Sequence, residues 1–215
     1  SGVLAFGKHF PGHGDTAVDS HINLPVVPHD MQRLKTVELH PFQAAIDAGV
    51  AGIMSAHVTF PTIDSTPRLA ASLSSPVLTG LLRQEMGYQG LLVTDSLEMG
   101  ALAQSGYPAP KAAVLALQAG ADLLLFNRDH KMHQEAHALV VEWVKSGKIP
   151  LARLDEALRR VLQAKAAYSL LSPSLPEAGS AAQTCGAPEH TALVRRVAGE
   201  AIALLHDPAG LLPLT

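Results

Sequence analysis

Three histidines and two aspartates lie in one short segment near the start of the chain, KHFPGHGDTAVDSH, residues 8–21. Within it, Asp19 and His21 are separated by one residue, so in an extended or turning loop their side chains point to the same side. A carboxylate placed there can orient an imidazole for proton transfer. Gly12 and Gly14 indicate a mobile loop around this pair. A solvated surface loop with incidental histidines is the alternative, and composition does not decide between the two.

Asp95 is a second candidate for chemistry, because it directly follows the apolar run GLLVT. A carboxylate at the end of a buried strand can be held rigidly at the base of a pocket, as a catalytic nucleophile or a substrate ligand must be. Asp is also a common cap for a following helix, and position alone leaves both roles open. Glu98 comes three residues later, where the partner in a capping box is expected, and we predict that structural role for it.

A metal site is a rival interpretation of the histidines. His9, His13, His21 and His57 would be the ligands, but their spacings match no helical His-x-x-x-His pair and no Cys/His ligand pattern. Cys185 is the only cysteine, which excludes an internal disulfide and a thiolate-rich metal site. We therefore predict no metal and no cofactor.

The elements that must position these residues follow a repeated strand-helix order. Apolar runs that end in polar, Gly or Pro residues predict buried strands over 2–10, 51–61, 90–96 and 121–127. Helical periodicity, Pro starts and Gly ends predict helices over 37–50, 74–90, 108–120, 130–148 and 151–168. Such alternation indicates an α/β fold with a parallel sheet, either doubly wound or closed into a barrel.

Polar side chains stand at the carboxyl end of each predicted strand. Lys8 and His9 end the first, and His57, Asp95 and Asn127 end the next three. Ligands bind at this edge of parallel sheets and barrels. We therefore expect the four segments to point their polar ends at one pocket.

Composition narrows the class of protein. The 215 residues are long enough for a sizeable core, and 47% of them are apolar. The net charge is −3 and no Lys/Arg block occurs, so we predict no nucleic-acid partner. No apolar run approaches the roughly 20 residues of a membrane helix. The first residues also lack the features of a signal peptide, so we expect a cytoplasmic protein without a membrane partner.

The motifs resemble those of the family 3 glycoside hydrolases, specifically their β-N-acetylglucosaminidase branch. Residues 8–21 are similar to that branch's signature, Lys-His-Phe-Pro-Gly-His-Gly, four variable residues and then Asp-Ser-His. LLVTDSLEMGAL resembles the nucleophile segment, and QAGADLLLF and GKIPLARLDEALRRVLQAK resemble the last barrel strand and the closing helix. The resemblance implies a (β/α)8 TIM barrel. VLAFGKHF looks like its fifth strand, so the chain resembles the C-terminal half, strands 5 to 8 plus closing helices.

The resemblance also implies catalytic roles. Asp95 matches the nucleophile, which forms a covalent glycosyl-enzyme with retention of configuration. His21 matches the acid/base, oriented by the Asp that Asp19 matches. The implied reaction removes β-linked N-acetylglucosamine from cell-wall muropeptides or chitin-type oligosaccharides.

The remaining site residues are implied in the same way. Lys8 and His9 match residues that bind sugar hydroxyls, and His57 is assigned to substrate binding with them. We assign Gly12, His13 and Gly14 to holding the shape of the loop.

We expect three regions: residues 1–168 as the C-terminal half of a barrel, 169–190 as a Pro/Ser/Ala/Gly linker, and 191–215 as a helix and the start of a truncated second domain. An inactive or sugar-binding fragment of such an enzyme is the alternative, and a metal-dependent hydrolase a weaker one. A β-glucosidase is disfavoured because that branch lacks the Asp-Ser-His element. Self-association is expected if the half-barrel is the whole chain.

Overall fold

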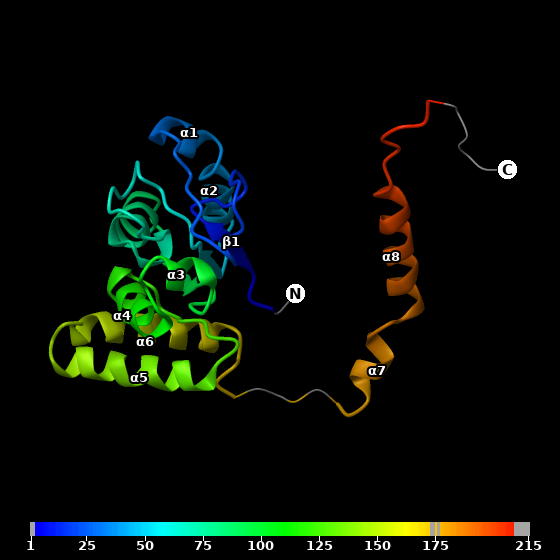
Figure 1. The fold of residues 1–215 in the computed structure, drawn as a ribbon. Helices are drawn as coiled ribbons and strands as arrows, with labels where there is room; N and C mark the ends of the chain where they lie inside the picture. Colours follow the sequence, from blue (N-terminus) through cyan, green and yellow to red (C-terminus); the bar gives the residue numbers. More distant parts are fainter. Residues whose placement is uncertain (1–2, 173–174, 176, 209–215) are drawn as a thin grey trace. The chain divides into compact units, whose positions relative to one another are not determined.

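The computed structural model describes residues 3–172, 175 and 177–208. Two compact units are present, Ser1–Leu171 and Ser172–Thr215. Figure 1 shows the fold, and the helices and strands of the first unit follow one another in this order: β1 (Phe6–Phe10), α1 (Met31–Thr36), α2 (His40–Asp47), β2 (Gly52–Ser55), η1 (Ala71–Leu73), η2 (Pro76–Glu85), β3 (Leu91–Thr94), α3 (Gly100–Gln104), α4 (Ala109–Ala119), α5 (His130–Lys145) and α6 (Leu151–Ala167).

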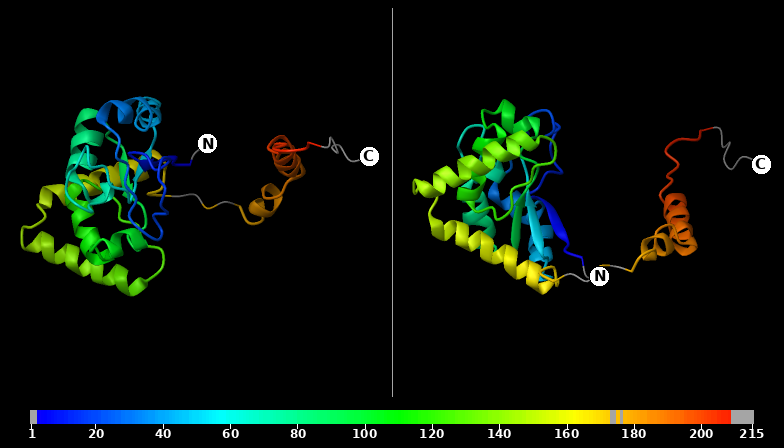
Figure 2. Two further views of the ribbon diagram at one scale, coloured as in Figure 1. Left: turned by 45° about the horizontal axis from the view of Figure 1, so that its top comes forward. Right: turned by 90° about the horizontal axis from the view of Figure 1, so that it is seen from below.

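The first unit contains a parallel sheet of three strands in the order β1-β2-β3, and Figure 2 shows these strands side by side. Phe6 pairs with Gly52 on β2, and Gly52 pairs with Leu91 on β3, so the three strands start level with one another. Their carboxyl ends therefore lie at the same edge. The prediction of an α/β fold with a parallel sheet is confirmed to this extent.

The predicted fourth strand is only partly formed, which corrects the sequence prediction for 121–127. This segment runs beside β3 but makes a single parallel bridge, between Val93 and Leu123. At Leu125 the backbone N–H binds the Thr94 side-chain Oγ1 (3.1 Å) instead of a backbone carbonyl. Because that side chain interrupts the ladder, the segment follows the sheet without being a regular strand.

Helices pack against the sheet and against one another to form the core. The α2 helix lies against β1, α6 against β3, and α4 against α5, α6, η1 and η2. Phe10 and Phe42 are buried and pack edge to face, with ring centroids 5.2 Å apart. The predicted helix over 74–90 is a π-helix, η2, rather than an α-helix. Apolar spacing over ten residues does not distinguish these two helices, so the sequence could not have shown it.

A buried ionic network is centred on Asp122. The Asp122 side chain is fully buried and accepts hydrogen bonds from three arginines, Arg83 (2.7 Å), Arg153 (3.0 Å) and Arg160 (3.1 Å). Its Oδ2 also accepts from the backbone N–H of Leu92 on β3 (3.0 Å). The network thus joins η2, β3 and α6 through one carboxylate.

The second unit contains α7 (Ser180–Thr184) and α8 (Pro188–Glu200). The α7 helix lies within 169–190, the segment predicted as a linker, and α8 overlaps the predicted helix of 191–215. The apolar end of that region, residues 209–215, lies outside the described residues. Among the residues that the structure describes, no helix is long and apolar enough to cross a membrane.

Candidate active site

Lys8 and His9 lie on β1, at the point where its pairing with β2 is irregular. Lys8 is opposite Met54, but Phe10 is opposite Ser55, so His9 is an extra residue without a partner on β2. The Lys8–His9 and Phe10–Pro11 peptide bonds are both cis. Bulges of this kind occur next to active sites, where they change the direction of a side chain. Here the bulge stands at the carboxyl end of the strand, beside the start of the loop.

His13 holds the loop that follows β1 through both ring nitrogens. Nδ1 lies 3.0 Å from Thr16 Oγ1, and Nε2 lies 2.7 Å from Ser20 Oγ. The far end of the loop rests on α3, because a Cβ added to Gly100 would stand only 2.6 Å from the His21 carbonyl oxygen. Gly100 thus allows the backbone of the loop to approach the helix closely.

Asp19 and His21 form the hydrogen-bonded pair that their spacing predicts. Asp19 Oδ1 lies 2.8 Å from His21 Nδ1 and also accepts the His21 backbone N–H at 2.8 Å. The backbone N–H and then the imidazole of His21 lower the pKa of Asp19. Nδ1 is occupied by Asp19, so Nε2 of His21 is the nitrogen left to exchange a proton with a bound molecule. The His21 side chain is 66% exposed.

Asp95 directly follows β3, and both oxygens of its carboxylate have a neighbour. Oδ1 accepts the backbone N–H of Ser96 (2.7 Å), and Oδ2 lies 3.5 Å from His9 Nε2. Burial lowers the pKa of His9, and the Asp95 charge opposes this only in part. His9 is therefore neutral at neutral pH. Only 21% of the Asp95 side chain is exposed, which fits a carboxylate at the base of a pocket.

One cavity brings most of the predicted residues together. It has a volume of about 560 Å³ and is lined by Lys8, His9, His13, Gly14, Asp19, Ser20, His21 and Asp95. The carboxylate on the end of a strand and the Asp-His pair on the loop thus face the same space. Such a cavity can hold a sugar-sized ligand, with one group positioned for nucleophilic attack and another for proton transfer.

His57 is placed differently from the other predicted site residues. It is 1% exposed, with Nδ1 2.7 Å from Ser72 Oγ and Nε2 2.9 Å from the Ser96 carbonyl oxygen. Both nitrogens are used inside the protein, and none remains for a sugar hydroxyl. The ring instead supports the backbone directly after Asp95. Among the residues that the structure describes, no cluster of metal-binding side chains includes His9, His13, His21 or His57.

The buried His57 should make the stability of the protein depend on pH. Burial lowers the pKa of this imidazole below its usual 6.5. When the pH falls below about 6.5, the unfolded chain binds a proton at His57 and the folded chain does not, so the free energy of unfolding decreases. Urea unfolding between pH 7.5 and 5.5 measures this. In His57→Gln, the slope of the free energy of unfolding against pH should be smaller than in the wild type by up to about 1.4 kcal/mol per pH unit, which is the value for one proton.

His137→Gln is the matched control, because His137 is exposed on α5. Its slope should equal that of the wild type. An unchanged slope in His57→Gln would contradict a neutral, buried His57.

Glu98 has a role that the sequence did not reveal, and the predicted capping box is wrong. Its carboxylate accepts three backbone N–H groups of a distant turn, those of Asn127 (2.6 Å), Arg128 (2.8 Å) and Asp129 (2.6 Å). Desolvation raises the pKa of Glu98, but the three donors outweigh it and lower the pKa overall. Ser96 Oγ also donates to Asn127 Oδ1 (2.8 Å). Asn127, the polar residue predicted at the end of the fourth segment, is thereby tied to the turn after Asp95.

Curated relatives align with this chain over its full length. Beta-hexosaminidase A of Pseudoalteromonas piscicida is 35% identical over 230 residues, which cover 100% of this chain and 38% of the relative. A beta-N-acetylglucosaminidase/beta-glucosidase of Cellulomonas fimi is 32% identical, covering 100% of this chain and 39% of the relative. The chain therefore spans about two fifths of the length of these relatives.

Solved structures agree with these sequence matches. A glycoside hydrolase family 3 beta-N-acetylglucosaminidase from Paenibacillus sp. str. FPU-7 is 42% identical with a TM-score of 0.89, covering 96% of this chain and 39% of that chain. Beta-glucoside phosphorylase BglX is 29% identical with a TM-score of 0.90, covering 99% and 40%. Residues 1–164 match the family described as Glycosyl hydrolase family 3 N terminal domain, which has a TIM-barrel-like α/β fold. The chain belongs to glycosyl hydrolase family 3.

Proposed function

We propose that this chain carries the catalytic groups of a retaining glycoside hydrolase that removes β-linked N-acetylglucosamine from cell-wall muropeptides or chitin-type oligosaccharides. The observation that carries the proposal is the shared cavity, in which Asp95 and the Asp19–His21 pair face the same space. Relatives named beta-hexosaminidase and a structure named as a beta-N-acetylglucosaminidase support this substrate class.

In the first step, Asp95 attacks the anomeric carbon of the sugar. The bond from this carbon to the leaving oxygen breaks as His21 donates a proton to that oxygen, and a glycosyl ester of Asp95 forms. In the second step, His21 takes a proton from water, which attacks the same carbon and releases Asp95. Two inversions leave the configuration unchanged.

Histidine suits the exposed position of the proposed acid/base. A carboxylic acid must be buried to keep its proton at neutral pH, whereas an imidazole exchanges protons near neutrality without burial. Asp19 accepts at Nδ1 and leaves Nε2 for the substrate. Lys8 and the neutral His9 line the same cavity, and we assign them to the sugar hydroxyls.

We further propose that β1, β2, β3 and the segment 121–127 correspond to strands 5 to 8 of a barrel. Their parallel order and the polar residues at their shared edge support this correspondence. The share of the relatives that the chain covers, about two fifths, supports it as well.

Hydrolysis of aryl and alkyl β-N-acetylglucosaminides by the purified chain tests the proposal. In His21→Ala, kcat/KM should fall by about 10²–10⁴-fold for an alkyl leaving group, which needs a proton donor, and less for nitrophenol, which needs little. His137→Ala, with an exposed histidine outside the cavity removed, should match the wild type. Equal losses for both leaving groups would contradict the acid/base role. A folded chain without turnover would favour the sugar-binding fragment.

Phosphorolysis is a second candidate, favoured by the fold match to a protein named as a beta-glucoside phosphorylase. The exposed Lys8 and three histidines line the cavity, so an incoming phosphate meets cationic or neutral groups beside the two carboxylates. The same assay with inorganic phosphate distinguishes the reactions. If sugar 1-phosphate is the main product, phosphate attacks in place of water in the second step, and the reaction is phosphorolysis.

A further inference from the structure

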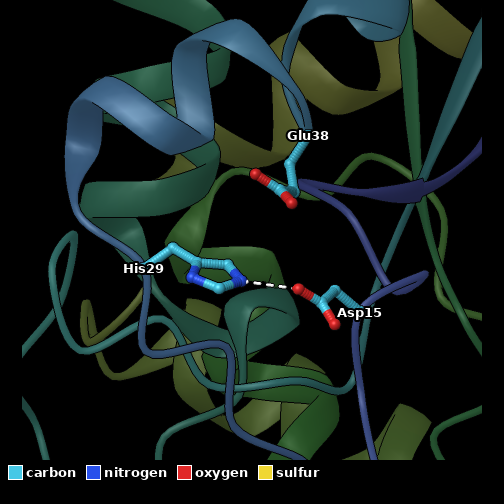
Figure 3. Close-up of side chains that lie close together, drawn as sticks. All are labelled: Asp15, His29 and Glu38. Carbon is cyan, nitrogen blue, oxygen red and sulfur yellow. Dashed lines mark hydrogen bonds and ion pairs between the residues drawn. The ribbon is translucent and has the colours of Figure 1, made fainter.

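Asp15, His29 and Glu38 form a polar cluster outside the cavity described above. Figure 3 shows their side chains converging from three segments: the loop after β1, the irregular segment before α1, and the connection between α1 and α2. One possible ligand atom from each residue lies within 4.8 Å of the other two. His29 Nε2 and Asp15 Oδ2 are 2.7 Å apart and form a hydrogen bond.

The burial and hydrogen bonding of Glu38 are a second observation that favours a cation at this cluster. Its side chain is only 6% exposed. Oε1 accepts from Arg33 (3.0 Å), but the buried Oε2 has no hydrogen-bond partner among the described residues. A buried carboxylate oxygen without a donor is costly, and buried polar atoms in folded proteins are nearly always paired. The carboxylate faces the His29–Asp15 pair in Figure 3.

The carboxylates of the cluster outnumber the cationic groups beside them, which favours binding of a positive ion. The two carboxylates, Asp15 and Glu38, have one guanidinium between them, because Arg33 lies 3.4 Å from Asp15 Oδ2 as well as near Glu38. The Arg33 side chain is 42% exposed and can shift toward water. A cavity of about 340 Å³, lined in part by Asp15, Arg33 and Glu38, gives an entry path. One imidazole nitrogen and two carboxylate oxygens match the ligand types of Zn²⁺.

We propose that Asp15, His29 and Glu38 bind a divalent transition-metal ion of the Zn²⁺ type. Small side-chain movements bring the three ligand atoms to Zn²⁺ distances of about 2.0–2.2 Å, with water as the fourth ligand. When the ion binds Nε2 of His29, the hydrogen bond to Asp15 is broken and the neutral imidazole keeps its one proton on Nδ1. The ion ties the loop that carries Asp19 and His21 to the segment before α1. The site goes beyond the proposed hydrolase activity and does not depend on it.

Calorimetric titration of the metal-free full chain with ZnCl₂, without substrate, tests the site. One equivalent should bind. His29→Ala and Asp15→Asn should each weaken binding by at least about 100-fold. Asp15 is 59% exposed, so its variant will fold even if a change at the buried Glu38 does not.

Two control variants locate the ion. His137→Ala removes an exposed imidazole elsewhere, and His21→Ala removes the imidazole of the catalytic pair. Both should retain the wild-type affinity. Absence of binding, wild-type affinity in Asp15→Asn or His29→Ala, or loss of the equivalent in His21→Ala would each overturn the proposal, the last by placing the ion at the catalytic pair.

Discussion

Replacing Asp95, the proposed nucleophile, by Asn will lower kcat for a nitrophenyl β-N-acetylglucosaminide by about 10⁴-fold or more, as loss of a nucleophile does in other enzymes with covalent intermediates. The amide has the same shape and can still accept the Ser96 backbone N–H through Oδ1. It cannot form a glycosyl ester. The variant therefore removes the chemistry and leaves the turn after β3 in place.

A mechanism-based label separates this effect from a structural one. An activated fluoro-sugar should add one sugar mass to the peptide containing Asp95 in the wild type and none in Asp95→Asn. Asp155→Asn, which changes an exposed Asp on α6, should retain both the activity and the label. A label on a different residue, or activity within tenfold of wild type in Asp95→Asn, would remove Asp95 from the proposed role.

Replacing Asp122 by Asn will destabilise the first unit by about 3–5 kcal/mol, the cost of breaking a buried ion pair from one side. Arg83, Arg153 and Arg160 are each 9–13% exposed and would lose their shared anion. Burial lowers the pKa of Arg83, and the Asp122 charge opposes this. Without that charge, a buried guanidinium is left uncompensated.

Urea unfolding followed by circular dichroism measures the change. Glu156→Gln is the control, because Glu156 binds the same Arg153 and Arg160 but its side chain is 45% exposed. It should cost about 1 kcal/mol or less, as partly exposed ion pairs do. Equal costs for the two variants would show that burial of Asp122 is not what makes the network important.

Local patterns predicted the parts of the candidate site that depend on neighbours in sequence. Asp19 and His21 are two residues apart, so their hydrogen bond needs only a turn. The meeting of Asp95 with Lys8 and His9 followed from one topological rule, that parallel strands end at the same edge.

The parts that were missed depend on tertiary contacts. Whether His57 faces the cavity or the interior depends on the direction of the chain after β2. The presence of a polar residue at the end of a strand does not specify that direction. The carboxylate of Glu98 binds N–H groups of 127–129, and no local motif records such a distant partner. The helix α1 was not predicted either, although Asp30 caps it by accepting the Arg33 N–H (2.8 Å).

The two hydrogen bonds between Asp19 and His21 are both internal to the loop. The orienting carboxylate therefore travels with the imidazole, and displacement of the loop does not take the pair apart. By contrast, a histidine oriented by a residue on the sheet would lose its tautomer and direction whenever the loop moved away. In the proposed mechanism, a proton donor that carries its own orienting group would keep its tautomer in any position of the loop, and it would be ready to react each time it reaches the sugar.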